Sequence, residues 1–285
     1  MDYPLARLKA SLRDLPPTAR RIAEVIVRNP EDVLSMSVGD LAEAAQSSEG
    51  SVIGLCQQIG AKGFPELKIA IAREISTGRA LLHEDLVPGD SPADVVKKIG
   101  TSHMLAVQDT LKVLDPDAVN RAAMLLVEAQ RIEFYGIGSA APIAEDAAYR
   151  FLRLGLVTKS VTDSHAQAVS AGFAGPKVAT VTISHSGRTQ ETLAATRIAR
   201  EAGARTICIT NYGRSPLQNY CEVVLFTAAE ETKYRMEALS SRLAQMVVID
   251  ALYGCAAIAR WEKSLSAIEK SYDIIATKRL LNSEK

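Results

Sequence analysis

Apolar residues recur every three to four positions throughout the first 80 residues, a spacing that predicts helices. Pro16-Pro17 breaks the chain before the first of them, and Asn29-Pro30 is expected to stop it. The predicted helices cover about 18–28, 37–45, 49–59 and 64–75. Ser48 can cap the third of these, after a polar turn at 46–48. The sequence therefore predicts a small all-α domain over residues 1–78.

The pattern changes after residue 131, where short β-branched runs alternate with helical segments. The predicted strands are 132–135, 157–161, 178–183, 206–210 and 223–226. Helices are expected over about 92–113, 116–129 and 237–260, and the Gly- and Pro-containing stretch 79–91 is interpreted as a linker. Apolar strands that alternate with helices are typical of a parallel sheet covered on both faces. We therefore expect an α/β domain over 92–285, with five parallel strands in the order 2-1-3-4-5.

Two of these strands end in loops rich in glycine and hydroxyl groups. The first strand is followed by GIGSAA (136–141) and the third by SHSGRT (184–189). In the expected strand order these strands are neighbours, and ligands bind at the carboxyl ends where the winding reverses. Each loop precedes a helix, whose free N–H groups attract anions. Hydroxyls from Ser139, Ser184, Ser186 and Thr189 can donate to phosphate oxygens, so the two loops predict a phosphate cradle without a metal ion.

Two other interpretations of these loops remain open. A Ser/Thr-rich turn that only caps a helix has the same composition. Gly136, Gly138 and Ala141 also fit the GxGxxA pattern of dinucleotide-binding sites, with Asp163 after the second strand as a ribose ligand. A dinucleotide site does not require the second hydroxyl-rich loop, which favours the phosphate cradle.

Bulk composition changes this picture little. Basic and acidic residues both number 33, so net charge nominates no partner. The N-terminal stretch has no apolar core of a signal peptide, and the apolar run 246–259 contains Asp250 and is interpreted as a buried helix. The four cysteines, Cys56, Cys208, Cys221 and Cys255, are expected to be buried thiols of a reduced cytosolic protein. No metal site and no cofactor is expected, because the four histidines form no ligand-like cluster.

GIGSA and ISHSGRTQET resemble the loops of the sugar isomerase (SIS) domain, which bind phosphosugars, and ALSSRLAQMVVIDALYG (238–254) adds to this likeness. Residues 37–74 resemble the helix-turn-helix domain of RpiR-type bacterial transcription regulators. The resemblance implies a homo-oligomeric cytoplasmic regulator of carbohydrate use, whose operator binding responds to a phosphosugar. It also implies which residues contact that effector. They are Gly138, Ser139, Ser184, Ser186, Gly187 and Thr189.

The chain departs from this family in two places. Ala140 stands where many relatives have a second serine. The expected recognition helix, SSEGSVIGLCQQIG, contains no Lys or Arg, and Gly54 stands where relatives often have Arg. Base contacts would then come from neutral groups, and phosphate contacts from cations outside the helix. The DNA-contact candidates are Ser48, Ser51, Gln57, Gln58, Lys62 and Arg73.

Two further functions fit parts of the sequence. A sugar-phosphate isomerase needs a general base and a ring-opening acid, for which the candidates are His165, His185, Glu191, Glu230, Glu231 and Glu237. A phosphosugar sensor that acts on a protein partner would explain a recognition helix without positive charge. The helical domain at 1–78 is unexplained by an isomerase, which favours the DNA-binding regulator.

Overall fold

The computed structural model describes residues 4–77, 86–87, 89–229 and 239–277, and the chain folds as two compact units. The first unit comprises Met1–Leu114, Asn211–Ser215 and Phe226–Ala244. The second comprises Asp115–Thr210, Pro216–Leu225 and Gln245–Lys285. Most of the predicted linker at 79–91 lies outside the described residues, so the predicted domain limits stay a prediction.

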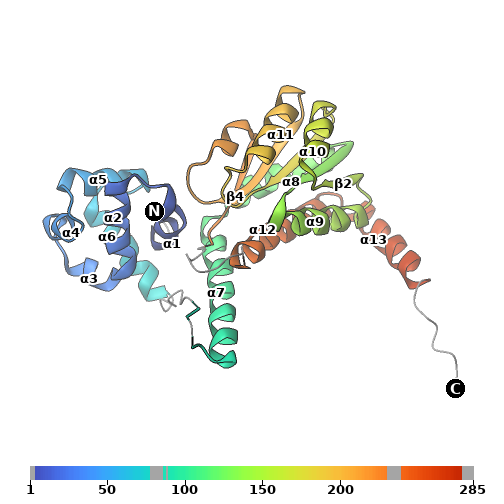
Figure 1. Cartoon of the computed structure of the whole chain (residues 1–285). Coiled ribbons are helices and arrows are strands. Elements are labelled where there is room, and N and C mark those ends of the chain that lie inside the picture. Colours follow the sequence, from blue (N-terminus) through green and yellow to red (C-terminus); the bar gives the residue numbers. More distant parts are fainter. Residues whose placement is uncertain (1–3, 78–85, 88, 230–238, 278–285) are drawn as a thin grey trace, which may run out of the picture. The chain divides into compact units, whose positions relative to one another are not determined.

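The first unit begins with six short helices around one apolar core (Figure 1). They are α1 (Pro4–Ser11), α2 (Pro17–Arg28), α3 (Pro30–Ser35), α4 (Val38–Ala44), α5 (Glu49–Gln58) and α6 (Phe64–Thr77). Ile22 and Ile26 from α2, Leu41 from α4 and Leu67 from α6 are fully buried in that core. The four helices predicted in this region are therefore confirmed, and their observed ends differ from the predicted ends by at most two residues.

The turn between α4 and α5 has the compact form expected of a helix-turn-helix. Ser37 and Asp40 form a capping box at the start of α4, and the Ser48 hydroxyl accepts a hydrogen bond from the Ser51 N–H at the start of α5. Gln46 has a φ of +48°, which lets the chain reverse between the two helices. The polar turn predicted at 46–48 is thus confirmed.

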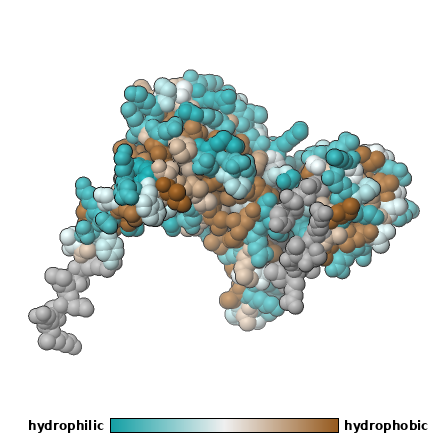
Figure 2. Space-filling view, turned by 180° about the vertical axis from the view of Figure 1, so that it is seen from behind, coloured by the Kyte–Doolittle hydropathy of each residue, from teal (hydrophilic) through white to brown (hydrophobic). Residues whose placement is uncertain are grey.

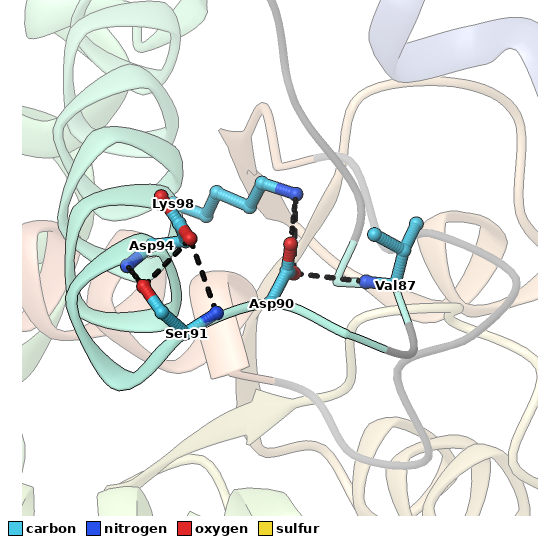
Figure 3. Close-up of polar contacts among 5 residues, drawn as sticks. All are labelled: Val87, Asp90, Ser91, Asp94 and Lys98. Carbon is cyan, nitrogen blue, oxygen red and sulfur yellow. Dashed lines mark hydrogen bonds and ion pairs between the residues drawn. The ribbon is translucent and has the colours of Figure 1, made fainter.

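Helix α7 (Pro92–Val113) begins at a second capping box (Figure 3). The Ser91 hydroxyl accepts a bond from the Asp94 N–H, and the Asp94 carboxylate accepts one from the Ser91 N–H. Lys98 forms an ion pair with Asp90 at 2.9 Å, and Asp90 also accepts a bond from the Val87 N–H. The hydrogen bonds to Lys98 and Val87 lower the pKa of Asp90 below its usual value. These contacts fix the start of α7 as the sequence predicts.

The second unit holds most of a five-stranded sheet in the order β2-β1-β3-β4-β5, which confirms the predicted topology; the last residues of β4 and β5 are counted with the first unit. The strands are β1 (Arg131–Tyr135), β2 (Thr158–Val161), β3 (Val178–Ile183), β4 (Arg205–Asn211) and β5 (Val223–Thr227). The registers of β1 with β2 and β3, and of β3 with β4, are all parallel. Every residue of β3 is buried, as expected for a central strand covered on both faces.

Helices cover both faces of this sheet (Figure 1). The helices that accompany the sheet are α8 (Pro116–Glu128), α9 (Ala141–Arg153), α10 (Ser164–Gly172), α11 (Gln190–Glu201), α12 (Leu239–Ala259) and α13 (Trp261–Ala276). Phe134 of β1 meets Phe151 of α9, whose ring also contacts Tyr253 of α12. Tyr135 packs on the opposite side with Ala171 of α10 and Ala195 of α11. Successive side chains of β1 therefore pack into the apolar layers on the two opposite faces of the sheet.

Some details differ from the sequence expectations. Pro30 begins α3 as well as ending the preceding helix, because proline fits the first turn of a helix. Cys56 and Cys208 are buried, and burial raises the pKa of the Cys56 thiol to about 11, but Cys221 and Cys255 are only partly buried. The run 246–259 is buried along one stripe of α12 rather than all round, with Ile258 exposed.

One stretch among the described residues, Ser240–Ala259 in α12, is long and apolar enough to cross a membrane. Core helices of soluble proteins meet the same criterion.

Candidate functional site

The two hydroxyl-rich loops leave the sheet side by side. Strands β1 and β3 are neighbours, and Tyr135 pairs with Thr182 in their register. The β1 loop (136–141) and the β3 loop (184–189) therefore start within a residue of the same level, at the carboxyl ends of the strands. This is the position at which the order 2-1-3-4-5 reverses its winding, where ligands of such sheets bind.

The β3 loop is held by bonds between its own hydroxyls and amides. Ser184 is 5% exposed, and its Oγ accepts a hydrogen bond from the Gly187 N–H at 3.2 Å. Ser186 is exposed, and its Oγ accepts from the Arg188 N–H at 3.2 Å. A hydroxyl that accepts one bond still has its proton to donate. Both serines therefore keep a donor for an anion while they shape the loop.

Gly187 and Thr189 complete this loop. Gly187 has a φ of +59°, a conformation that glycine adopts without the strain a Cβ would bring. Thr189 precedes α11, yet its side chain makes no capping bond to the helix. The first N–H groups of α11 thus have no side-chain cap from Thr189, which leaves this helix start suited to an anion.

The β1 loop is shaped by tight packing at its first residue. A Cβ at Gly136 would lie 2.5 Å from the Ala140 carbonyl oxygen and 2.8 Å from its carbon, so only glycine fits there. Gly138 has a φ of +61° and, like Ser139, is exposed. Gly138 and Ser139 are therefore accessible from solvent, whereas Ala140 is buried and offers no hydroxyl.

Gln167 of α10 holds the start of the β1 loop by side-chain hydrogen bonds, a role that the sequence did not reveal. Its side chain is fully buried, and Nε2 donates to the Val161 carbonyl at 2.6 Å and the Gly136 carbonyl at 3.4 Å. Gln167 thus ties the ends of β1 and β2 together. A single glutamine within a helix has no sequence signature for such a contact, although a polar residue on a buried helix face is a weak signal.

Strand β4 supports the β3 loop on its other side. The Thr210 hydroxyl donates to the His185 carbonyl at 3.2 Å, and the Leu217 N–H donates to the Gly187 carbonyl at 3.3 Å. The Ser184 N–H donates to the Ile209 carbonyl at 3.0 Å. The β3 loop is therefore fixed by residues on both sides of the turn that follows β4.

A buried carboxylate, Glu133 on β1, belongs to the sheet rather than to the loops. It accepts bonds from Tyr135 and Ser170 and pairs with Arg131 and Lys159. Burial alone would raise its pKa, but the bonds from Ser170 and Tyr135 and the charges of Lys159 and Arg131 hold its pKa below the usual value. With its charge balanced by these partners, Glu133 is a structural group.

The residues of the competing interpretations are placed as follows. Asp163 caps α10, because its carboxylate accepts a bond from the Ala166 N–H at 2.8 Å. That bond explains Asp163 without a ribose, which weakens the dinucleotide interpretation. Of the isomerase candidates, His165 and Glu191 are exposed at helix starts and His185 is half-buried. Glu230, Glu231 and Glu237 lie outside the described residues.

A hollow of about 770 Å³ lies at the edge of the sheet opposite the two loops. Its lining includes Gln130 and Val157, next to the amino ends of β1 and β2, and Ile258 and Trp261 from α12 and α13. Trp261 is 53% exposed. Polar and apolar residues are interspersed over the surface seen from behind (Figure 2). This hollow has no paired glycine–hydroxyl loops, so the carboxyl edge remains the stronger candidate.

The outer face of α5 is the candidate DNA surface. Gln57 and Gln58 are exposed, and so is Ser48, whose hydroxyl lies 2.9 Å from that of Ser51. Ile53 is 40% exposed, and a Cβ at Gly54 would meet nothing within 4 Å. This face thus offers amides, hydroxyls and one apolar side chain, with space where a longer residue would fit.

The cations near α5 divide into two groups. Arg21 donates to the Ala45 and Gln46 carbonyls at 3.1 and 3.0 Å, and Lys68 donates to the Leu34 and Met36 carbonyls at 3.3 and 2.9 Å. These two side chains hold the helix-turn-helix together. Lys62 is exposed, whereas the Arg73 side chain lies outside the described residues. Of the two predicted phosphate contacts, Lys62 and Arg73, only Lys62 has a side chain that the structure describes, and it is exposed as such a contact requires.

Two family models match the chain. Residues 3–78 match the "Helix-turn-helix domain, rpiR family", and residues 125–254 match the "SIS domain".

Similar proteins include an uncharacterized HTH-type transcriptional regulator of Caldanaerobacter subterraneus, 34% identical over 98% of this chain and 99% of its own length. The HTH-type transcriptional regulator HexR of Pseudomonas aeruginosa is 33% identical, with 87% of each chain covered. Among solved structures, the NanR protein of Vibrio vulnificus complexed with ManNAc-6P has a TM-score of 0.63 and 24% identity. That match covers 97% of this chain and 99% of NanR.

Proposed function

The chain belongs to the RpiR family of helix-turn-helix transcriptional regulators that carry a SIS domain, and we propose from this that a phosphorylated sugar controls its operator binding. The observation that carries the effector proposal is the pair of loops at the ends of β1 and β3. The β1 loop offers an exposed Ser139 beside a glycine backbone, and the β3 loop offers Ser184, Ser186 and an uncapped helix start. NanR, whose fold is similar, is complexed with ManNAc-6P.

The proposed binding mode needs no metal ion. The phosphate accepts hydrogen bonds from the serine and threonine hydroxyls and from the N–H groups at the start of α11, and the helix dipole adds to this attraction. The sugar ring lies outward from the phosphate. We propose that the effector is a hexose or pentose phosphate, or an amino-sugar phosphate of the same kind.

For DNA, we propose that α5 enters the major groove and reads bases through neutral groups. Gln57 and Gln58 can pair with adenine, and Ile53 can contact a thymine methyl. Lys62 contacts a phosphate from outside the groove. Two half-sites require two copies of the chain, so the active form is a homo-oligomer. A regulator of this kind works in the cytoplasm, where the bacterial chromosome lies.

The test is a fluorescence-anisotropy titration of the full chain with fragments of its own upstream region at two salt concentrations. ManNAc-6P, glucose 6-phosphate and ribose 5-phosphate are each compared with the unphosphorylated sugar. We expect one phosphosugar to change the operator Kd, and its free sugar to have no effect. If the protein prefers no fragment over random DNA in any of these conditions, the regulator proposal fails and a protein partner becomes the better hypothesis.

Two substitutions separate the proposed DNA contacts. Lys62→Ala weakens binding to operator and random DNA alike and reduces the salt dependence by about one contact. Gln57→Ala lowers the preference for operator over random DNA by about 1–3 kcal/mol. Lys177→Ala, which removes an exposed lysine from the second unit, is the matched control for charge. Equal effects of Lys62→Ala and Lys177→Ala contradict the assignment of Lys62.

A further inference from the structure

Two of the four cysteines, Cys208 and Cys221, lie in the second unit and belong to neither the proposed phosphate site nor the DNA surface. Cys208 is a fully buried residue of β4, and Cys221 is a partly buried residue that precedes β5. Their spacing in the sequence matches no cysteine motif. The structure nevertheless brings them together on one face of β4.

This face of β4 is covered by the short helix η3 (Pro216–Tyr220). Alternate side chains of a strand point to the same face of the sheet, so Thr206, Cys208 and Thr210 share one face. The Thr206 hydroxyl donates to the Tyr220 carbonyl at 2.7 Å, and the Thr210 hydroxyl donates to a carbonyl of the β3 loop at 3.2 Å. Cys208 therefore lies between two side chains that are bonded to the segments covering it.

Backbone bonds hold both ends of the segment that contains η3. The Leu217 N–H donates to the β3 loop at 3.3 Å, and the Glu222 N–H donates to the Thr206 carbonyl at 2.7 Å. Cys221, which adjoins Glu222, is thus held beside the part of β4 that carries Cys208. The Cys221 thiol also donates to the Leu217 carbonyl at 3.4 Å.

The two thiols are in direct contact. The Cys208 thiol forms a hydrogen bond with the Cys221 thiol, and this bond, together with burial, raises the pKa of Cys208 well above its usual value. Cys208 therefore keeps its proton at neutral pH, while Cys221 is the member of the pair that solvent reaches. An accessible cysteine next to a second thiol that can capture its oxidised form is the arrangement of redox-sensing pairs.

We propose that Cys208 and Cys221 form a redox-active pair, which hydrogen peroxide converts into an intramolecular disulfide. Peroxide transfers one oxygen atom to the Cys221 sulfur, which becomes a sulfenic acid, and the first water is released. The Cys208 sulfur then attacks the Cys221 sulfur. The S–S bond forms as the S–O bond breaks, and the hydroxide leaves with the Cys208 proton as the second water. The two thiols supply the two electrons that reduce the peroxide, and a thiol reductant reverses the reaction.

The disulfide also changes the support of the β3 loop, a consequence that rests on the proposed function for its meaning. Oxidation removes the proton that Cys221 donates to the Leu217 carbonyl, and it ties the end of η3 covalently to β4. The Leu217 N–H holds the Gly187 carbonyl of the β3 loop. The redox state of the pair therefore acts on a residue that braces the proposed phosphate site, and phosphosugar affinity differs between the two states.

The first arm of the test maps the disulfide in the full chain after treatment with hydrogen peroxide. Trypsin cuts after Arg205 and Arg214, so the two cysteines fall in separate peptides, 206–214 and 215–233. Under non-reducing conditions, we expect mass spectrometry to find these peptides as one linked species that dithiothreitol separates. Absence of this species overturns the proposal, whether Cys221 stays reduced or is oxidised further.

Three variants make this arm specific. Cys221→Ser and Cys208→Ala abolish the linked species, and Cys221→Ser keeps a hydroxyl donor for the Leu217 carbonyl, so the test does not depend on how well Cys208→Ala folds. Cys255→Ser removes another partly buried thiol, in α12, and is the matched control that retains the link. A disulfide that joins two copies of the chain, seen as a dimer on a non-reducing gel in place of the internal link, also overturns the proposal.

The second arm measures the Kd for the active phosphosugar in the reduced and the oxidised protein. We expect the two values to differ by about fivefold or more in the wild type and to be equal after the same treatments in Cys221→Ser. Equal values in the wild type overturn the effect on the β3 loop. If neither form binds a phosphosugar, the proposed function fails, and the peptide mapping alone still decides whether Cys208 and Cys221 are a redox pair.

Discussion

The two serines of the β3 loop allow a test in which binding and folding are expected to separate. Ser186→Ala removes an exposed hydroxyl that accepts one bond from the Arg188 N–H. Ser184→Ala removes a buried hydroxyl that accepts from the Gly187 N–H. If both hydroxyls donate to a phosphate, each substitution removes one hydrogen bond to a charged group. Such a bond contributes about 1.5–3 kcal/mol.

That free energy corresponds to roughly a 10- to 150-fold weaker Kd for the phosphosugar. The cost in folding is smaller. The Gly187 N–H also donates to the Ser184 carbonyl at 3.2 Å, so it keeps an acceptor in Ser184→Ala. We therefore expect Ser184→Ala to lose about 1 kcal/mol of unfolding free energy at most. Ser186→Ala, at an exposed position, should be nearly neutral.

The assay is isothermal titration calorimetry with the phosphosugar found active on the wild type, together with thermal unfolding of the free protein. Ser271→Ala is the matched control, since its hydroxyl donates within α13, away from the loops. Unchanged phosphosugar affinity in both loop variants refutes the phosphate assignment and leaves the β3 loop as a simple turn. A large loss of Tm in Ser186→Ala would instead show that this hydroxyl holds the fold.

Three further substitutions test other parts of the structure. Gly136→Ala places a Cβ against the Ala140 backbone, so we expect a Tm several degrees lower and loss of phosphosugar binding in calorimetry. Gly54→Ala meets no atom within 4 Å and removes a helix-breaking glycine, so thermal unfolding should show a gain of about 0.4–1 kcal/mol. Glu133→Gln should cost about 1.5–3 kcal/mol in urea unfolding at pH 7. Because the folded-state pKa of Glu133 is lowered, this stabilisation is present above the usual value of 4.5 and disappears as the pH falls through the folded-state pKa, so the difference from wild type should shrink in acid. A difference that stays constant down to pH 3 contradicts this account of Glu133.

Strands β1, β3 and β4 could be predicted because each is a mostly buried run that glycine or polar residues end. Strand β2 has one buried residue, and the order of the strands follows from the alternation with helices rather than from any single run. The glycines of the β1 and β3 loops also carry a local signal, since Gly138 and Gly187 adopt a positive φ that favours glycine. The roles of Arg21 and Lys68 were not predictable in this way. Their bonds reach carbonyls 24 to 34 residues away, as in Arg21 to Ala45 and Lys68 to Leu34. Side chains that look like free cations in the sequence can therefore be structural.

The same distinction applies to Thr210 and Asn211. In the sequence they end an apolar strand, and a Thr-Asn pair there signals only a turn. In the structure the two residues have different partners. The Thr210 hydroxyl donates to the His185 carbonyl of the β3 loop, and the Asn211 amide donates to the Ala10 carbonyl of α1, 201 residues away in the sequence. Two adjacent residues therefore fix segments that lie far apart in the sequence, and a strand-ending Thr-Asn pair carries no local signal for either contact.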